Sequence, residues 1–266
     1  MALQVRSTKQ DAPGPLKLAV YGQTKAGKTF LAGTFPSPFI ISLGAESGIA
    51  TLTQQEQEAF YVTVSSIAEM NEALDLFKGQ YRERKWQTAV IDTVTLFGRM
   101  VQMELTQNGA RSMEHRDWMK FLLQFLNVRD VLHSCGVHVV WVFHVDEVKV
   151  GDSTVGLKPK LAGQAQKEIL QTVGIIAYLD KLELPAVRDE KGEITKPAQT
   201  VRRLWTKCPE DFRPPFEAGS WYDGPLEKGL YKPSFDELMK YLAPVDEAGQ
   251  PVGRQHVIRD PLAGRC

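Results

Sequence analysis

The sequence predicts an α/β fold in which helices flank a mostly parallel central sheet. Short apolar runs that read as buried strands alternate with segments of helical spacing over most of the chain. The chain has 266 residues and 43% hydrophobic content, which is enough for one large core. We expect one domain over residues 16–243, a flexible arm at residues 1–15 and a disordered tail at residues 244–266.

The composition excludes several classes of protein. Thirty-two basic residues balance thirty-two acidic ones, so any nucleic-acid binding has to come from local loops. Cys135, Cys208 and Cys266 show no C-x-x-C spacing, which argues against a zinc site or a disulfide framework and favours a reducing cytoplasm. The longest apolar run, residues 137–143, is too short to span a bilayer, so we expect a cytoplasmic protein without a membrane partner.

A glycine-rich stretch at residues 22–29 fits the pattern G-x-x-x-x-G-K-[ST], between a predicted strand at residues 16–21 and a predicted helix at residues 30–34. The glycines allow a nest of backbone N–H groups around phosphate oxygens, Lys28 reaches the β- and γ-phosphates, and the Thr29 hydroxyl reaches Mg²⁺. The pattern predicts ATP and Mg²⁺ as cofactors; the alternative is an ordinary glycine-rich surface turn. The predicted nucleotide-binding residues are Gly22, Gln23, Thr24, Lys25, Ala26, Gly27, Lys28 and Thr29.

Two acidic residues follow apolar strands. Glu46 comes after the predicted strand at residues 39–43, at the sheet edge where ligands bind; the alternative is an acid that favours a helix N-terminus. Asp92 ends the predicted strand at residues 88–91 in the form of a Walker B acid and is expected to hold Mg²⁺ beside Thr29; the alternative is a helix-capping aspartate. Between them, residues 60–64 read as a strand and residues 66–77 as a helix with its own capping box.

The next helix, residues 94–105, is expected to turn Leu96, Met100 and Met103 toward the core. The segment at residues 107–118 then lies outside any apolar pattern and combines basic residues with an aromatic one. Such a loop is able to contact a nucleic-acid backbone and stack a base. The alternative is an ordinary solvated loop, with the aromatic residue starting the following helix as a core residue. The candidate DNA-binding residues here are Arg111, Arg116 and Trp118.

Residues 137–143 form the most apolar strand and should lie at the centre of the sheet. This strand ends in His144, a candidate γ-phosphate sensor or, alternatively, a satisfied structural histidine. Residues 146–163 follow as a long loop without regular structure, which we expect either to couple the nucleotide to a second ligand or to be a solvated surface loop. Its candidate DNA-binding residues are Lys149, Lys158 and Lys160.

The C-terminal part predicts a helix at residues 164–171 and then a β-hairpin. Its first strand is residues 175–179, its tip residues 189–193 and its second strand residues 200–207. Residues 208–231 show no period. A capping box at Ser234 and Glu237 opens a last helix through Leu242.

The combination of the phosphate loop, Gly-Ala-Glu-Ser-Gly, Val-Ile-Asp-Thr and Val-Phe-His resembles the RecA-core ATPases, and most of all the compact RecA-related nucleotide-binding proteins of phages. The resemblance implies a RecA-like P-loop NTPase core. It implies that Glu46 is the general base, that Lys28 and His144 contact the phosphates, and that Lys207 reaches an ATP bound by the neighbouring subunit. It also implies that residues 107–118 and 146–163 are DNA-binding loops.

On this resemblance we expect an ATPase stimulated by single-stranded DNA that acts in phage-type recombination or strand annealing. The implied partners are single-stranded DNA, further copies of the chain in a filament or ring, and a single-strand-binding protein. The implied setting is the cytoplasm of a bacterial host cell. The alternatives are a nucleotide-gated protein-binding module with little hydrolysis and a small-molecule phosphotransferase.

Overall fold

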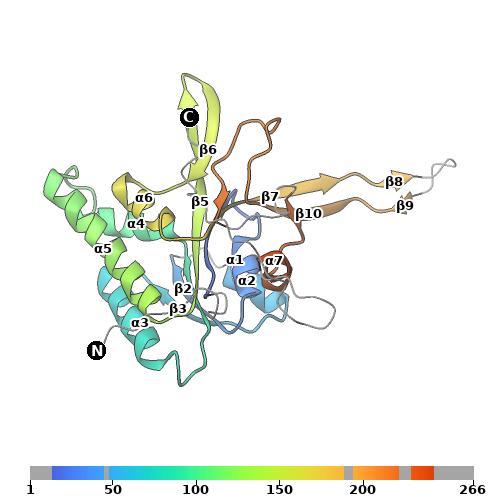
Figure 1. Ribbon diagram of the computed structural model, residues 1–266. Coiled ribbons are helices and arrows are strands. Elements are labelled where there is room, and N and C mark those ends of the chain that lie inside the picture. The colour runs from blue at the N-terminus through green and yellow to red at the C-terminus, as the bar shows by residue number, and fades with distance from the viewer. Residues whose placement is uncertain (1–13, 45–47, 189–193, 222–228, 243–266) are drawn as a thin grey trace.

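A mostly parallel sheet forms the centre of the molecule, and helices cover both of its faces (Figure 1). The computed structural model describes residues 14–44, 48–188, 194–221 and 229–242. Of the predicted arm only Gly14 and Pro15 belong to this part of the chain, and the predicted tail at residues 244–266 lies outside it. The predicted α/β fold class is confirmed.

The main sheet has the strand order β12-β10-β7-β1-β5-β4-β2-β3. The strands from β7 to β3 run parallel, whereas β10 is antiparallel to β7 and β12 to β10. The carboxyl ends of β1 and β4 therefore meet at one edge, beside His144 of β5, where open α/β sheets bind their ligands. The strands are β1 (Lys17–Gly22), β2 (Pro38–Leu43), β3 (Phe60–Val64), β4 (Thr88–Asp92), β5 (His138–Val150), β6 (Ser153–Pro159), β7 (Ile175–Leu184), β8 (Val187–Arg188), β9 (Ile194–Lys196), β10 (Gln199–Trp205), β11 (Gly219–Ser220) and β12 (Leu230–Tyr231).

Two apolar clusters lie on opposite faces of the sheet. On β1, Ala19 and Tyr21 belong to one cluster and Leu18 and Val20 to the other, so the strand is buried on both faces and reads as a continuous apolar run. Helices α3 to α6 pack into the first cluster, and α1, α2 and α7 into the second. The helices are α1 (Lys28–Gly33), α2 (Ile49–Gln54), α3 (Ile67–Gln80), α4 (Val94–Leu105), α5 (His115–Ser134), α6 (Gly163–Leu170) and α7 (Phe235–Leu242).

The capping boxes predicted for α3 and α7 have the expected N-cap contacts. The Glu69 N–H donates to Ser66 Oγ at 3.1 Å, and the Glu237 N–H donates to Ser234 Oγ at 3.2 Å. Such contacts satisfy backbone donors that a helix start leaves without a partner, so they fix where each helix begins.

The prediction that residues 146–163 form a loop without regular structure is wrong. β5 continues to Val150, turns at Gly151 and returns as β6, with paired residues from Val145 and Pro159 to Val150 and Ser153. Figure 1 shows this β5–β6 hairpin projecting beyond the sheet. The ladder satisfies the backbone N–H and C=O groups that an irregular loop would leave to water.

The predicted core face of α4 and the possible core position of Trp118 on α5 also need correction. On α4 the fully buried residues are Val94, Phe97 and Val101, while Met103 is 39% exposed and Leu96 and Met100 are only partly buried. On α5, which begins within the predicted loop, Phe121, Phe125 and Leu132 are buried, but Trp118, which the alternative interpretation placed in the core, is 38% exposed. The buried stripe of α4 is displaced from the predicted one, because the sheet and the neighbouring helices decide which side of the helix is covered.

The predicted C-terminal β-hairpin is confirmed by the antiparallel pairing of β7 with β10. Its predicted tip at residues 189–193 lies outside the described residues, and the short strands β8 and β9, one on each side of it in the sequence, pair with each other. The segment after β10 adds β11 and β12 to the sheet.

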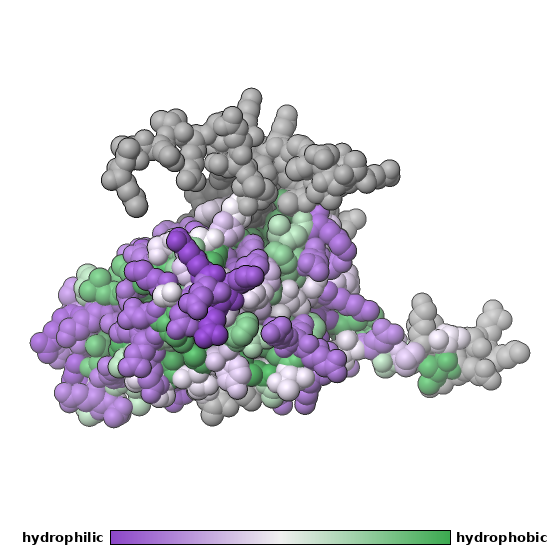
Figure 2. Space-filling view, turned by 90° about the horizontal axis from the view of Figure 1, so that it is seen from below, coloured by the Kyte–Doolittle hydropathy of each residue, from purple (hydrophilic) through white to green (hydrophobic). Residues whose placement is uncertain are grey.

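The end of the molecule opposite the β5–β6 hairpin is mostly hydrophilic. Figure 2 shows this face from below, with hydrophobic residues scattered among polar ones rather than gathered over one element. Scattered apolar residues are normal on a protein surface. Among the described residues visible on this face, the apolar side chains therefore form no continuous patch.

Candidate nucleotide-binding site

The turn between β1 and α1 needs glycine at both fixed positions of its pattern. A Cβ on Gly22 would lie 2.1 Å from the carbonyl oxygen of Leu179 on β7, so only glycine allows the two strands to pack. Gly27 has a φ of 99°, a conformation that side chains other than glycine's rarely adopt. The backbone therefore has the shape that the phosphate-loop pattern predicts.

Lys28 lies inside this turn and is only 7% exposed. Its Nζ donates to the carbonyl oxygens of Gly22 at 2.9 Å and Gln23 at 2.8 Å. Two carbonyls from the same loop thus hold the ammonium group where a bound anion would meet it. A cation held at such a position favours a phosphate ligand.

Thr29 and Asp92 come together at the edge of the sheet. Thr29 Oγ1 donates to Asp92 Oδ2 at 2.6 Å, which joins α1 to the tip of β4. Hard cations such as Mg²⁺ prefer oxygen ligands, and a hydroxyl beside a carboxylate is the pair that holds Mg²⁺ in phosphate-loop sites. These two residues therefore fit a magnesium ion. The alternative of a helix-capping aspartate fails, because Thr93 is the N-cap of α4 and its Oγ1 accepts from the Leu96 N–H at 3.2 Å.

A cavity of about 480 Å³ opens over this loop. Its wall combines residues from the loop, β4, β5 and β10, and it has the size of an ordinary small-molecule site. Gly22, Gln23 and Ala26 build the loop without lining the cavity. The predicted residues that line it are Thr24, Lys25, Gly27, Lys28, Thr29, Asp92 and His144.

His144 lies where the nucleotide cavity meets a second cavity of about 550 Å³, and it lines both. Its backbone is fixed by neighbours. The His144 N–H donates to Thr95 Oγ1 at 3.0 Å, the Thr95 hydroxyl donates to the Lys160 carbonyl at 2.7 Å, and the Lys160 N–H donates to the His144 carbonyl at 2.8 Å. Thr95 thus links the start of α4, just beyond Asp92, to the base of the β5–β6 hairpin.

Two other predicted catalytic residues are not placed in this cavity. Glu46 lies outside the described residues. Lys207 is exposed beyond the end of β10 and does not line the cavity, so its role toward a neighbouring subunit stays a prediction. The basic residue that β10 contributes to the wall is Arg202, which was not predicted from the sequence. Strand alternation alone does not show which of the basic residues on β10 faces the loop.

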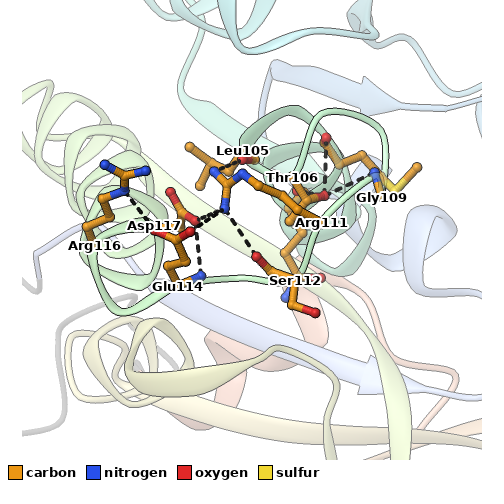
Figure 3. Close-up of polar contacts among 10 residues, drawn as sticks. Leu105, Thr106, Gly109, Arg111, Ser112, Glu114, Arg116 and Asp117 are labelled. Carbon is orange, nitrogen blue, oxygen red and sulfur yellow. Dashed lines mark hydrogen bonds and ion pairs between the residues drawn. The ribbon is translucent and has the colours of Figure 1, made fainter.

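Arg111, predicted to contact DNA, joins the end of α4 to the start of α5 (Figure 3). Its Nη2 donates to the Leu105 carbonyl at 2.6 Å, and its Nη1 donates to Asp117 Oδ2 at 2.5 Å and to the Ser112 carbonyl at 3.1 Å. Hydrogen bonds from Arg111 and from the Glu114 backbone N–H lower the pKa of Asp117 to about 2. The guanidinium therefore has a structural use within the chain.

The other candidates in this segment are more accessible. Arg116 has 71% of its side chain exposed and pairs with Glu114 at 3.0 Å. Trp118 contacts the edge of the Phe121 ring, with centroids 5.7 Å apart, while part of its indole faces solvent. Their contact with DNA stays a prediction.

The lysines of the β5–β6 hairpin each lie near a carboxylate. Lys149 Nζ is 3.5 Å from Glu147, and Lys158 and Lys160 are 3.9 and 3.8 Å from Asp146. These pairs are exposed, so each contributes little to stability. The hairpin therefore offers charges of both signs rather than a basic strip.

Comparisons with known proteins agree with this geometry. A family model described as "AAA domain" matches residues 14–207, which span β1 to β10 and most of the chain. No curated protein matches the sequence. Within the described ranges, no helix is long and apolar enough to cross a membrane, and no group of three or more His, Cys, Asp or Glu side chains could hold a metal ion.

Proposed function

We propose, from the premise that this chain belongs to the AAA domain family of P-loop ATPases, that its cavity over residues 22–29 binds ATP with Mg²⁺ and hydrolyses it. The observation that carries the proposal is the hydrogen bond of 2.6 Å between Thr29 and Asp92, beside the enclosed ammonium of Lys28. It brings two magnesium-type ligands and a phosphate-binding cation to one cavity, from segments far apart in the sequence.

The chemistry of such a site is positioning and charge stabilisation rather than covalent catalysis. Lys28 would exchange its contacts with the loop carbonyls for phosphate oxygens. Thr29 and Asp92 would hold Mg²⁺, which neutralises charge that develops on the phosphates. We assign Glu46 the role of orienting the attacking water and His144 the role of sensing the γ-phosphate, as the resemblance to RecA-core ATPases implies.

We further propose single-stranded DNA as the ligand that the β5–β6 hairpin reads. The support is that one strand connects the nucleotide cavity to the hairpin. β5 runs from the sheet core through His144 at the nucleotide cavity into the projecting hairpin, so a change at the cavity has a direct route to Lys149, Lys158 and Lys160. In this proposal the DNA phosphates displace Asp146 and Glu147 from these lysines, and copies of the chain assemble along the strand as a filament or ring.

A second candidate is a nucleotide-gated module that binds a protein. The observation that favours it is the apolar character of the hairpin, where Val148, Val150 and Val155 are 38, 69 and 44% exposed. Exposed β-branched residues on a projecting hairpin suit a protein surface better than a phosphate backbone.

The test is steady-state ATP hydrolysis with and without single-stranded DNA at low salt, where phosphate contacts are strongest. Wild type is compared with Lys28→Ala and Glu46→Gln. Turnover that DNA stimulates and that both substitutions abolish is the expected result. Turnover that DNA leaves unchanged would favour the second candidate, the nucleotide-gated module that binds a protein. Turnover that survives in Lys28→Ala would overturn the assignment of the site.

A further inference from the structure

Arg202 of β10 lies directly against the phosphate loop. A Cβ built on Gly27 would be 2.2 Å from Arg202 Nε, so the arginine side chain occupies the space that any larger residue at position 27 would need. The guanidinium also lies over the Phe30 ring, with 4.7 Å between Cζ and the ring centroid. Both Arg202 and Phe30 line the nucleotide cavity.

Its Nε is a donor without an acceptor. This atom is buried and has no hydrogen-bond partner among the residues that the structure describes. The neighbouring Arg203 differs, because its guanidinium donates to both carboxylate oxygens of Asp180 at 3.2 and 2.7 Å. Buried polar groups are nearly always satisfied, and leaving one without a partner costs free energy. The exception in the wall of a phosphate-type cavity points to an acceptor supplied by the ligand.

The side chain starts from a rigid position. Arg202 is paired with Lys181 in the ladder between β10 and β7, and its carbonyl accepts the Lys232 N–H at 2.9 Å. A guanidinium presented by a strand that is bonded on both sides is well placed for a directed contact, because little backbone freedom is lost when it binds.

Its place along the loop indicates which phosphates it meets. In phosphate loops the lysine reaches the β- and γ-phosphates and the Ser or Thr hydroxyl reaches Mg²⁺, while the preceding backbone N–H groups hold the α- and β-phosphates. Arg202 lies against Gly27, one of the loop residues that precede the lysine, and over the ring of Phe30. We propose that Arg202 binds the α- and β-phosphates of the nucleotide, in the same chain, from its position beside Gly27 and Phe30.

This inference rests on the proposed function and makes it more specific. ADP and ATP share the α- and β-phosphates, so a residue that binds them contributes to the affinity for both. A residue that senses the γ-phosphate contributes only for ATP. The bound diphosphate would also add a second link between the loop after β1 and the C-terminal hairpin, beside the direct contact of Arg202 with Gly27 and Phe30.

The experiment is a titration of the purified full chain with ADP and with ATP, each with Mg²⁺, for wild type, Arg202→Gln and Arg202→Lys. Removal of a charge-assisted hydrogen bond predicts that Arg202→Gln weakens both nucleotides about 10- to 100-fold. Arg202→Lys keeps the charge without the planar fork and should fall between the two. The melting temperature of each nucleotide-free variant shows whether the affinities are compared between folded proteins.

The matched control is Lys181→Gln. This substitution removes one positive charge from the residue that is paired with Arg202 in the ladder. Lys181 is exposed and does not line the cavity. Its affinities should stay at the wild-type values. Equal weakening in both variants would mean that only the general charge of the hairpin matters, and would overturn the inference.

The other outcomes separate the two proposals. Unchanged or tighter binding by Arg202→Gln, with wild type binding normally, overturns the role of Arg202 and leaves the proposed function intact. A weakening for ATP alone overturns the assignment to the α- and β-phosphates. Wild type that binds neither nucleotide overturns the proposed function itself. If Arg202→Gln does not fold, the same criteria apply to Arg202→Lys.

Discussion

The connection at residues 107–118 and the β5–β6 hairpin have a similar composition but different structures. Both are charged, contain glycine and follow a core element, and the sequence predicts DNA contacts for both. In the connection, the donors of Arg111 are used by Leu105, Ser112 and Asp117 within the chain. In the hairpin, the ladder satisfies the backbone and the side-chain charges meet only in exposed pairs of 3.5 to 3.9 Å. A basic residue is available to a ligand only where the fold has not already used its donors.

The largest expected effect is a loss of stability when the connection at residues 107–118 is disrupted. Arg111→Met should lower the free energy of unfolding more than any hairpin substitution, because it leaves the Asp117 carboxylate, 1% exposed, without its strongest partner. Urea unfolding followed by circular dichroism measures this, and ATP affinity of the folded protein should not change. If this variant is as stable as wild type, Arg111 has no structural role and is again a candidate DNA contact.

The next largest expected effect is the change in stability at acid pH that Asp117 causes. The pKa of Asp117 is about 2 in the folded protein and 3.8 as the reference value, so its ionised form stabilises the fold. This contribution is complete above the reference pKa and disappears as the pH falls through the folded pKa. The difference in unfolding free energy between wild type and Asp117→Asn should therefore shrink as the pH falls below 3.8. A difference that stays constant over that range would contradict the assignment.

A smaller effect is expected at the base of the hairpin. Thr95→Val removes the hydroxyl that bridges the His144 N–H and the Lys160 carbonyl, which should cost about 0.5–1.5 kcal/mol of stability. We also expect ATP to protect the hairpin amides from hydrogen exchange, and this protection should be weaker in Thr95→Val. Thr95→Ser retains the hydroxyl and is the control. Equal protection in the valine and serine variants would mean that Thr95 does not connect cavity and hairpin.

The smallest effect on stability is expected on the hairpin itself. The double substitution Lys149→Gln and Lys158→Gln should change the unfolding free energy by less than about 0.5 kcal/mol, since both ion pairs are exposed. If DNA is the ligand, this variant binds single strands more weakly. The slope of its binding constant against salt, on logarithmic scales, then falls by about 0.7 for each phosphate that the protein no longer neutralises.

The valine pair on the same hairpin provides the contrast. Val148→Ser with Val150→Ser leaves the charges in place, so it should preserve DNA binding and impair only a protein partner. Abolished DNA binding in the valine variant together with full binding in the lysine variant would contradict the phosphate contacts.

The sequence is most informative where chemistry is local. The phosphate loop depends on glycines at fixed spacing within one turn, and Asp92 stands at the end of a short apolar strand, so both are predictable from the sequence and lie together. Thr93 shows the limit of this reasoning: the capping role considered for Asp92 belongs to the next residue, a distinction that only the hydrogen bond to the Leu96 N–H reveals.

The β5–β6 hairpin and Arg202 escape prediction for a shared physical reason. In the hairpin, charged residues interrupt the alternating valines around Gly151 and Asp152, and its stability comes from a ladder between two segments rather than from either one. Arg202 meets Gly27 only because β7 lies between β1 and β10 in the sheet. Pairing between distant segments is not encoded in local spacing.

The most direct test of the account is a calorimetric titration of ATP into wild type and Lys28→Ala, with and without Mg²⁺. The account predicts one site per chain, stronger binding with Mg²⁺, and an affinity about 100-fold weaker for Lys28→Ala. Equal affinities for the two proteins would contradict it, because the enclosed lysine would then have no part in holding the nucleotide.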